Sequence, residues 1–170
     1  MLRPASVLLL GFLLQSPSAT SAGAQQLTAL GGIGNSFGWL GAQLERTTRS
    51  GRIGGFVGLG YVPEIDDGDP KGLAPAAGVR GYTKGKTHRG FLEAAVAVVA
   101  LQTGGAPVLG SVESKKLYGP TVQAGYRLTT GGGFSLLVSG GVGVAVGAST
   151  LVADSSLQPV LGLGLGYAWR

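Results

Sequence analysis

One serine, one histidine and an acidic segment are the side chains with which this chain could perform hydrolytic chemistry. Ser36 lies in G-N-S-F-G (34–38), which matches the G-x-S-x-G pattern of a nucleophile elbow. The acidic segment at 64–69 and His88 follow it in the chain order of a serine hydrolase triad. A nucleophile elbow needs a helix after the serine, and no helical pattern follows residue 38. We therefore interpret 34–38 as a hairpin turn and expect no catalytic residues.

The acidic segment could also hold Ca²⁺ through its carboxylates. Its spacing departs from the D-x-D-x-D-G pattern, because Ile65 stands where a ligand should be. Asp-Gly and Asp-Pro steps instead predict a solvated loop. The acidic residues of this loop are Glu64, Asp66, Asp67 and Asp69.

His88 is the single histidine and lies in a basic, polar segment at 83–90. Its neighbours predict a solvated turn, and no second histidine, cysteine or carboxylate completes a zinc site with it. We therefore expect neither a metal nor a cofactor.

Four charged residues form a second constellation, which the sequence places inside the protein. Glu93 and Arg127 fall on strand faces opposite the apolar ones, and Arg80 and Glu45 can join them. Lone charges in a narrow interior are costly, so these residues should pair. We expect Glu93 to lie between the guanidiniums of Arg80 and Arg127 and to close the interior as structural fill.

Alternation of apolar and polar residues predicts the elements that carry these charges, because side chains of a strand point to opposite faces in turn. The second strand is ambiguous, since Phe37 and Trp39 share the parity of Gln43 and Glu45, and a bulge would reconcile its two halves. Eight strands are predicted, at 26–35, 37–46, 53–61, 73–83, 91–102, 117–130, 134–147 and 157–170.

The connections between these strands alternate in length. Those at 47–51, 84–90 and 131–133 are short, and those at 63–72, 103–116 and 148–156 are long. The first connection, at Asn35 and Ser36, is the one short connection on the long side. Short turns at one end and longer loops at the other are typical of outer-membrane barrels. The fold class expected is an all-β, eight-stranded antiparallel up-and-down transmembrane β-barrel.

Composition excludes several other classes of protein. Only 12% of the residues are charged while 44% are hydrophobic, which is unlike a disordered chain. The net charge of +5 comes without a basic run, so we expect no nucleic acid partner. The absence of cysteine excludes a disulfide framework and a cysteine lipid anchor.

The first 24 residues have the pattern of an export signal. A basic start with Arg3 precedes an apolar run at 7–14, and small residues at 22–24 provide a cleavage site. We therefore expect a signal peptide at 1–24 and an outer-membrane β-barrel domain at 25–170.

The last strand ends in an aromatic pair two residues apart, Tyr167 and Trp169, which suits the interface between lipid and water. This ending resembles the C-terminal signal strand of bacterial outer-membrane barrels, except that Arg170 follows the aromatic. With the export signal, the strand count and the turn alternation, the mature chain resembles the small eight-stranded outer-membrane β-barrel proteins, the OmpA/OmpX-like group.

That resemblance implies a bacterial outer-membrane location, contact with outer-membrane lipid and lipopolysaccharide, and folding by the barrel assembly machinery. The wider group serves in wall anchoring, adhesion, surface masking and small-solute leakage, and a few members hydrolyse or transfer acyl groups on lipid A. For this chain we expect a structural or surface-interaction role through the three long loops.

Three alternatives remain open. The uncharged segment 134–153 is long enough for a transmembrane helix, although glycines interrupt it. A soluble lipocalin-like carrier would show the same alternation with its apolar face turned inward. A lipid-modifying enzyme of the outer membrane would need a serine and a histidine side by side.

Overall fold

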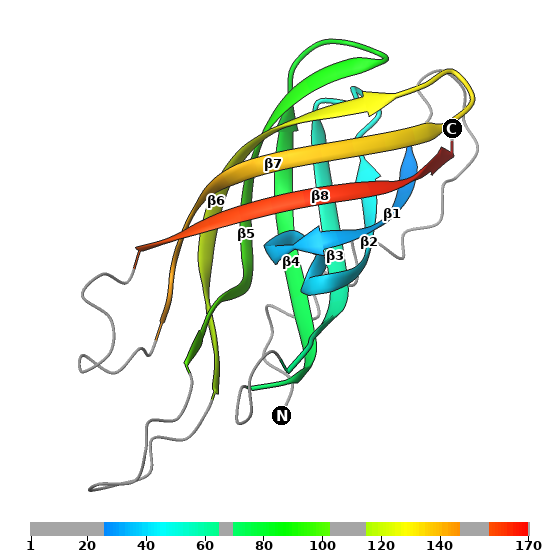
Figure 1. Cartoon of the computed structure of the whole chain (residues 1–170). Coiled ribbons are helices and arrows are strands. Elements are labelled where there is room, and N and C mark those ends of the chain that lie inside the picture. The colour runs from blue at the N-terminus through cyan, green and yellow to red at the C-terminus, as the bar shows by residue number, and fades with distance from the viewer. Residues whose placement is uncertain (1–25, 65–69, 103–114, 147–156, 170) are drawn as a thin grey trace, which may run out of the picture.

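Eight antiparallel strands, each hydrogen-bonded to the next along the chain, close into a barrel in the computed structural model of the protein (Figure 1). The structure describes residues 26–64, 70–102, 115–146 and 157–169. β1 pairs with β8, which closes the sheet. The predicted eight-stranded up-and-down barrel is therefore confirmed. The strands are β1 (Leu27–Gly34), β2 (Trp39–Thr47), β3 (Ile53–Val62), β4 (Gly72–Tyr82), β5 (His88–Gln102), β6 (Lys115–Thr129), β7 (Phe134–Val144) and β8 (Leu157–Trp169).

The two ends of the barrel differ in their connections, as the sequence predicts. At one end, here called the turn end, short segments at 48–52, 83–87 and 130–133 join consecutive strands. The other end, here called the loop end, carries the longer connections 63–71, 103–114 and 145–156. The strands also differ in length, because β1 has 8 residues while β5 and β6 have 15 each. The wall of the barrel is therefore higher on the side of β5 and β6.

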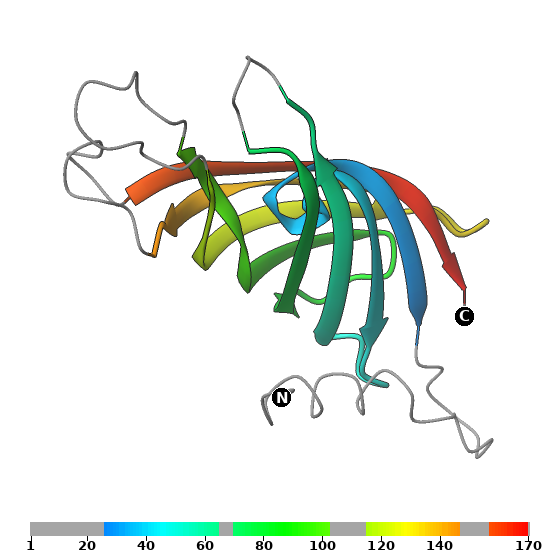
Figure 2. The same cartoon turned by 90° about the horizontal axis from the view of Figure 1, so that it is seen from below.

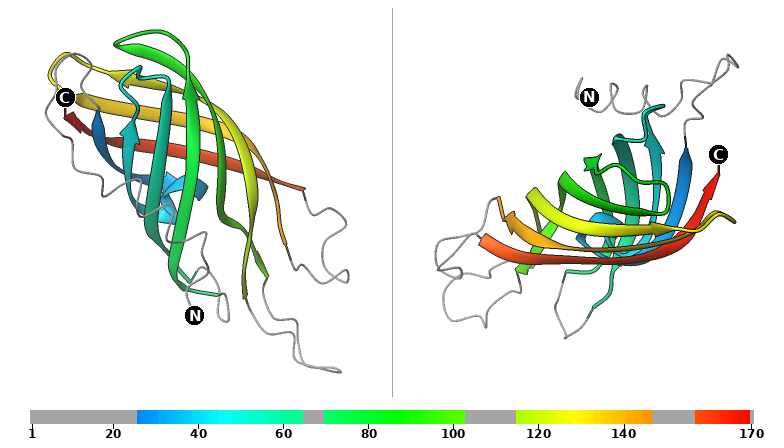
Figure 3. Two further views of the ribbon diagram at one scale, coloured as in Figure 1. Left: turned by 180° about the vertical axis from the view of Figure 1, so that it is seen from behind. Right: turned by 90° about the horizontal axis from the view of Figure 1, so that it is seen from above.

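The first connection of the chain turns into the barrel. After β1 the chain forms a single 3-10 turn, η1 (Asn35–Phe37), whose three residues are buried inside the ring of strands (Figures 2 and 3). Gly38 then adopts a left-handed conformation, φ +63°, which glycine adopts without strain. The expectation of an ordinary hairpin turn at 34–38 is therefore wrong, because the chain turns inside the lumen and fills part of it.

This inward turn also corrects the expectation for the second strand. Phe37 belongs to η1, so its parity carries no information about β2. β2 pairs without interruption with both β1 and β3, from Trp39 opposite Gly34 to Thr47 opposite Gly54. The bulge expected there is absent, and Gln43 and Glu45 face the lumen together.

Glycines on the inner face of the wall make room for η1. A Cβ atom on Gly164 would lie 2.3 Å from the ring of Phe37, and a Cβ atom on Gly60 would lie 2.1 Å from the carbonyl oxygen of Phe37. Such separations are too short for a real side chain, so only glycine lets the wall approach the turn. η1 therefore packs against the glycine-rich inner face of these strands.

The outer and inner faces of the wall have opposite chemistry. Every strand presents large apolar or aromatic side chains outward, and Leu92 and Leu161 leave 66% and 71% of their surface exposed. The inner face buries polar and charged side chains, including Gln43 and Gln123. The wall thus separates an apolar exterior from an interior that combines polar and charged side chains with a cluster of apolar and aromatic ones. The members of that cluster are Leu30, Phe37, Tyr82, Phe91 and Leu137.

The helical alternative for 134–153 is wrong for the residues that the structure describes there. Phe134–Val144 forms β7, paired with both β6 and β8. Residues 147–153 lie outside the described residues. Within the described ranges, none of the helical segments has the length and apolar character required to cross a membrane.

Candidate functional site

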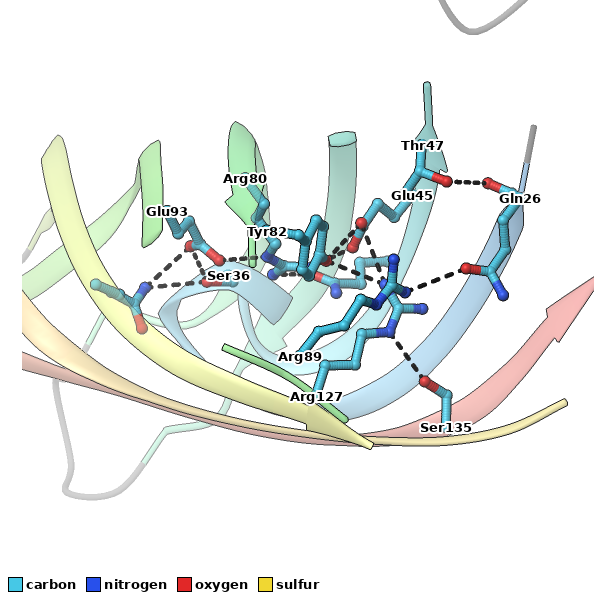
Figure 4. Close-up of polar contacts among 12 residues, drawn as sticks. Gln26, Ser36, Glu45, Thr47, Arg80, Tyr82, Arg89, Glu93, Arg127 and Ser135 are labelled. Atoms are coloured by element: carbon cyan, nitrogen blue, oxygen red, sulfur yellow. Dashed lines mark hydrogen bonds and ion pairs between the residues drawn. The ribbon is translucent and has the colours of Figure 1, made fainter. Parts of the chain in front are cut away.

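The charged residues that the sequence places in the interior meet in the lumen, toward the turn end (Figure 4). Glu45 comes from β2, Arg80 from β4, Glu93 from β5 and Arg127 from β6. All four side chains are completely buried. The barrel thus brings together four charges that are far apart in sequence, because their strands surround one narrow lumen.

Arg80 lies between two carboxylates. Its Nη1 donates to Oε2 of Glu45 at 2.6 Å, and its Nε donates to Oε2 of Glu93 at 2.7 Å. The third nitrogen, Nη2, donates to the side-chain oxygen of Gln43 at 3.2 Å. The guanidinium also lies 4.2 Å from the ring centre of Phe56, which adds a cation–π contact. All three nitrogens of this buried cation therefore have an acceptor.

Glu45, rather than Glu93, lies between two guanidiniums. Its second oxygen, Oε1, is 3.2 Å from Nη1 of Arg127 and accepts a hydrogen bond from the Tyr82 hydroxyl at 2.6 Å. Nη1 of Arg127 also donates to the Tyr82 oxygen at 3.0 Å. Glu45 is therefore the link between the two arginines.

The register of the strands explains why the expected arrangement around Glu93 is wrong. Glu93 lies opposite Arg80 on one side and opposite Gln123 on the other. Arg127 is four residues further along β6, opposite Arg89. The neighbour of Glu93 on β6 is therefore an amide, and Arg127 reaches Glu45 across the lumen instead.

Glu93 connects the charges to η1. Its Oε1 accepts hydrogen bonds from the Ser36 hydroxyl at 2.5 Å and from Nε2 of Gln123 at 3.1 Å. The side-chain oxygen of Gln123 in turn accepts from the hydroxyl of Ser139 at 2.8 Å. One hydrogen-bonded network thus runs from the arginines to the inward turn, and the serine of the G-x-S-x-G pattern belongs to it.

The network balances its own charge. Two carboxylates, Glu45 and Glu93, face two guanidiniums, Arg80 and Arg127, at contact distance. Burial removes water from all four groups, and each charge keeps an opposite charge as partner, which is the condition for such a cluster to be tolerated. Its chemistry is suited to filling and holding the lumen.

Sequence reasoning missed the polar residues that complete this network. Gln43, Tyr82 and Gln123 share the inward parity of the charges on their own strands, so parity could have identified them. Arg89 was expected in a turn but lies on β5 and faces inward. Its guanidinium donates to the carbonyl of Gly51 and lies 4.6 Å from the ring centre of Tyr82.

The three parts of the hydrolase pattern are not brought together by the described residues. Ser36 is buried in the lumen, whereas His88 is exposed on the outer face, where its Nδ1 contacts the Tyr126 hydroxyl. His88 is also the first residue of β5, so the expectation of a turn histidine is wrong. β5 begins earlier than expected because 88–90 pair with the end of β6.

The acidic loop is described only in part. Glu64 forms an exposed ion pair with Lys71, and the hydrogen bond that Lys71 donates to the Glu64 carboxylate raises the pKa of Lys71. Asp66, Asp67 and Asp69 lie outside the described residues, as do the expected signal peptide at 1–24 and Arg170. Within the described part of the chain, no group of three metal-binding side chains is present.

The aromatic pair at the end of β8 lies on the outer face at the turn end. Tyr167 and Trp169 are about half exposed, and their rings meet edge to face with centres 5.2 Å apart. Phe134 of β7 lies opposite Tyr167 and is exposed on the same face.

Neither a protein-family model nor a curated protein sequence matches the chain.

Proposed function

We propose that this protein is an outer-membrane β-barrel whose lumen is closed and whose role is structural or surface-interacting. The observation that carries the proposal is the distribution of side chains across the wall: the exterior is apolar on every strand, and the interior holds buried, paired charges. An apolar outer band around a polar interior is the arrangement of barrels that face lipid.

The aromatic residues support the same proposal. Tyr167, Trp169 and Phe134 gather on the outer face at the turn end, where an interface between lipid and water would lie in a spanning barrel. Contact with outer-membrane lipid and lipopolysaccharide, and folding by the barrel assembly machinery, are partners that this location entails.

A soluble lipocalin-like carrier is the alternative on the same fold. Such a carrier would turn its apolar face inward around a ligand and its charged face to water. Here Arg80, Glu45 and Glu93 occupy the lumen, and leucines such as Leu161 cover the exterior. This arrangement favours the membrane barrel.

The filled lumen supports a role other than transport of solutes. The arginine–glutamate network and η1 occupy the interior of a barrel whose strand number leaves room for little more than side chains. The interaction surface proposed is the loop end, whose long connections lie largely outside the described residues.

Cell fractionation followed by gel migration with and without boiling tests this proposal. The protein should be recovered with outer membranes, and the unboiled sample should migrate differently from the boiled one, because a barrel in detergent stays folded until it is heated. Recovery in the soluble fraction would contradict the membrane proposal and favour the carrier.

A further inference from the structure

The wall of the barrel is interrupted on one side near the loop end. β1 ends at Gly34, which lies opposite Gly162 of β8. β8 extends further, and its residues 159–161 pair with β7 beyond the point where β1 has ended. Figure 1 shows β8 extending well beyond the end of β1. The short β1 therefore leaves a side opening, bounded by residues 159–161 of β8 and by the start of β2.

A cavity of about 710 Å³ lies at this opening. Its lining includes residues of both faces of the wall: Leu40 and Leu161 point outward, while Asn35 and Gly162 belong to the inner side. Val99 of β5 lines it from across the lumen. A cavity lined by both faces joins the outer apolar surface to the interior of the barrel.

The lining of this cavity is mainly apolar. Three of its side chains carry polar groups, and two of these already have partners within the protein: Asn35 donates to the carbonyl of Val98 at 2.6 Å, and Ser139 donates to Gln123 at 2.8 Å. The third is Trp39, whose buried indole N–H has no hydrogen-bond partner among the described residues and is the one unpaired donor of the lining. The surface offered to a ligand therefore suits hydrocarbon better than a polar solute.

We propose that this cavity binds one hydrocarbon chain of a membrane lipid, which enters sideways from the bilayer beyond the end of β1, between β8 and the start of β2. The proposal rests on the proposed membrane location. The volume lies within the range of roughly 300–1,000 Å³ typical of small-molecule sites. The opening is flanked by outward-facing Ile33, Leu161 and Leu163, so a chain would pass from lipid to cavity along apolar surface.

The inward turn sets the floor of the site. Asn35 of η1 lines the cavity, and the next residue, Ser36, already donates to Glu93 of the charged network. A hydrocarbon chain that went deeper would have to displace these hydrogen bonds, which would leave a buried carboxylate with fewer partners. The hydrocarbon chain therefore ends at η1, while the polar headgroup of the lipid stays outside the barrel wall.

The two tryptophans of the chain allow a direct test, because Trp39 lines the cavity and Trp169 lies on the outer face at the opposite end. In the variant Trp169→Phe, fluorescence reports Trp39 alone. The full barrel would be reconstituted in phosphatidylcholine vesicles with bromine near the middle of the acyl chains. Bromine quenches tryptophan only at short range, so marked quenching of Trp39 is expected, and quenching no greater than in unbrominated vesicles would overturn the proposal.

Filling the cavity distinguishes a bound chain from lipid outside the wall. The three atoms nearest to a Cβ atom on Gly162 belong to side chains, and the closest is the hydroxyl of Ser139 at 2.6 Å, which would have to shift. Because Gly162 lines the cavity, Gly162→Leu should place its side chain there. Quenching of Trp39 should fall by about half or more, because a leucine there leaves too little room in a close-packed site. The matched control is Gly81→Leu, which adds the same side chain on the open outer face and should change nothing. If Gly162→Leu does not fold, Val99→Phe fills the cavity from the other side. Unchanged quenching in a folded filling variant would contradict the proposal.

Two further experiments identify the source of the hydrocarbon chain and test the cavity separately from the membrane location. A brominated free fatty acid in unbrominated vesicles should quench Trp39 less than the brominated phospholipid does, and the reverse order would overturn the assignment to a membrane lipid. In Trp39→Phe, quenching of Trp169 by lipid brominated near the glycerol reports insertion. Quenched Trp169 with unquenched Trp39 would refute the cavity alone, whereas failure to quench either tryptophan would refute the membrane location as well.

Discussion

Toward its turn end the lumen holds Glu45, Arg80 and Arg127 as a fully buried, paired network, whereas toward its loop end it holds an apolar cavity of about 710 Å³. β2 and β5 contribute residues to both regions, and η1 lies between them. At the turn end the alternation supplies charges that satisfy each other, and at the loop end it supplies small or apolar residues. One barrel thus combines a closed half with a half that opens sideways.

The difference follows from strand length and from the inward turn. Where all eight strands surround the lumen, buried charges can find partners on neighbouring strands. Where β1 has ended, the wall is open to the exterior and polar residues would face the apolar outer surface. The wall, and not the loops alone, therefore determines which half of the lumen is closed.

The largest effect is expected from breaking the charged half at its centre. Glu45→Ala removes the carboxylate that links Arg80 and Arg127, and it should cost about 3–5 kcal/mol of unfolding free energy because two guanidiniums stay buried with fewer partners. Urea unfolding in lipid vesicles, followed by gel mobility, measures the unfolding free energy of the variant and of the wild type. Glu93→Ala should cost less, since Arg80 keeps Glu45.

The matched control for this prediction is Glu64→Ala, which also removes a carboxylate paired with a cation. The Glu64–Lys71 pair is exposed at the loop end, and exposed pairs contribute little to stability. If Glu64→Ala destabilised the barrel as much as Glu45→Ala does, the buried network would not be what holds the lumen closed.

A smaller effect is expected at the boundary between the two halves. Gly164→Ala would place a Cβ atom 2.3 Å from the ring of Phe37, and overpacking of this kind costs about 1–3 kcal/mol. Combining it with Phe37→Leu should recover part of the loss relative to the sum of the two single changes, because a leucine side chain does not reach as far as the phenylalanine ring. Strict additivity of the two changes, measured by the same unfolding assay, would show that η1 is not seated on this glycine.

A weaker effect is expected on the outer face at the turn end. Trp169→Ala removes an edge-to-face contact with Tyr167, and aromatic pairs contribute about 0.5–1.5 kcal/mol beyond burial of their area. The yield of assembled barrel in outer membranes should also fall sharply, since this strand carries the predicted assembly signal. Full assembly of the variant at the wild-type rate would remove support for that signal.

The smallest effect is expected from His88→Ala. The ring is exposed and lies on the face opposite Ser36, so stability and any modification of lipid A should stay unchanged. Mass spectrometry of lipid A from cells with and without the variant measures this. A modification that depends on both the protein and His88 would instead favour the lipid-modifying alternative.

Much of the barrel could be predicted from sequence because most of its strands alternate between apolar and polar or small residues. Parity alone places Arg80, Glu93 and Arg127 on inner faces, and the structure buries all three there. Parity does not give register, however. Whether Glu93 lies opposite Arg127 or Gln123 depends on the lengths of the turns between strands, and the expected partner was wrong for that reason.

The inward turn could not be predicted because its sequence fits an ordinary hairpin. Gly34, Ser36 and Gly38 suit a surface turn as well as a 3-10 turn in the lumen, and the deciding contacts come from distant glycines such as Gly164. The cavity depends in the same way on where β1 stops relative to β8, which pairwise alternation does not encode.

Planar-bilayer conductance of the wild-type protein tests most directly the central claim that the lumen is closed. We expect no steady conductance, because Glu45, Arg80 and Arg127 are fully buried across the lumen and η1 occupies the space beside them. A persistent open channel in the folded wild type would contradict it.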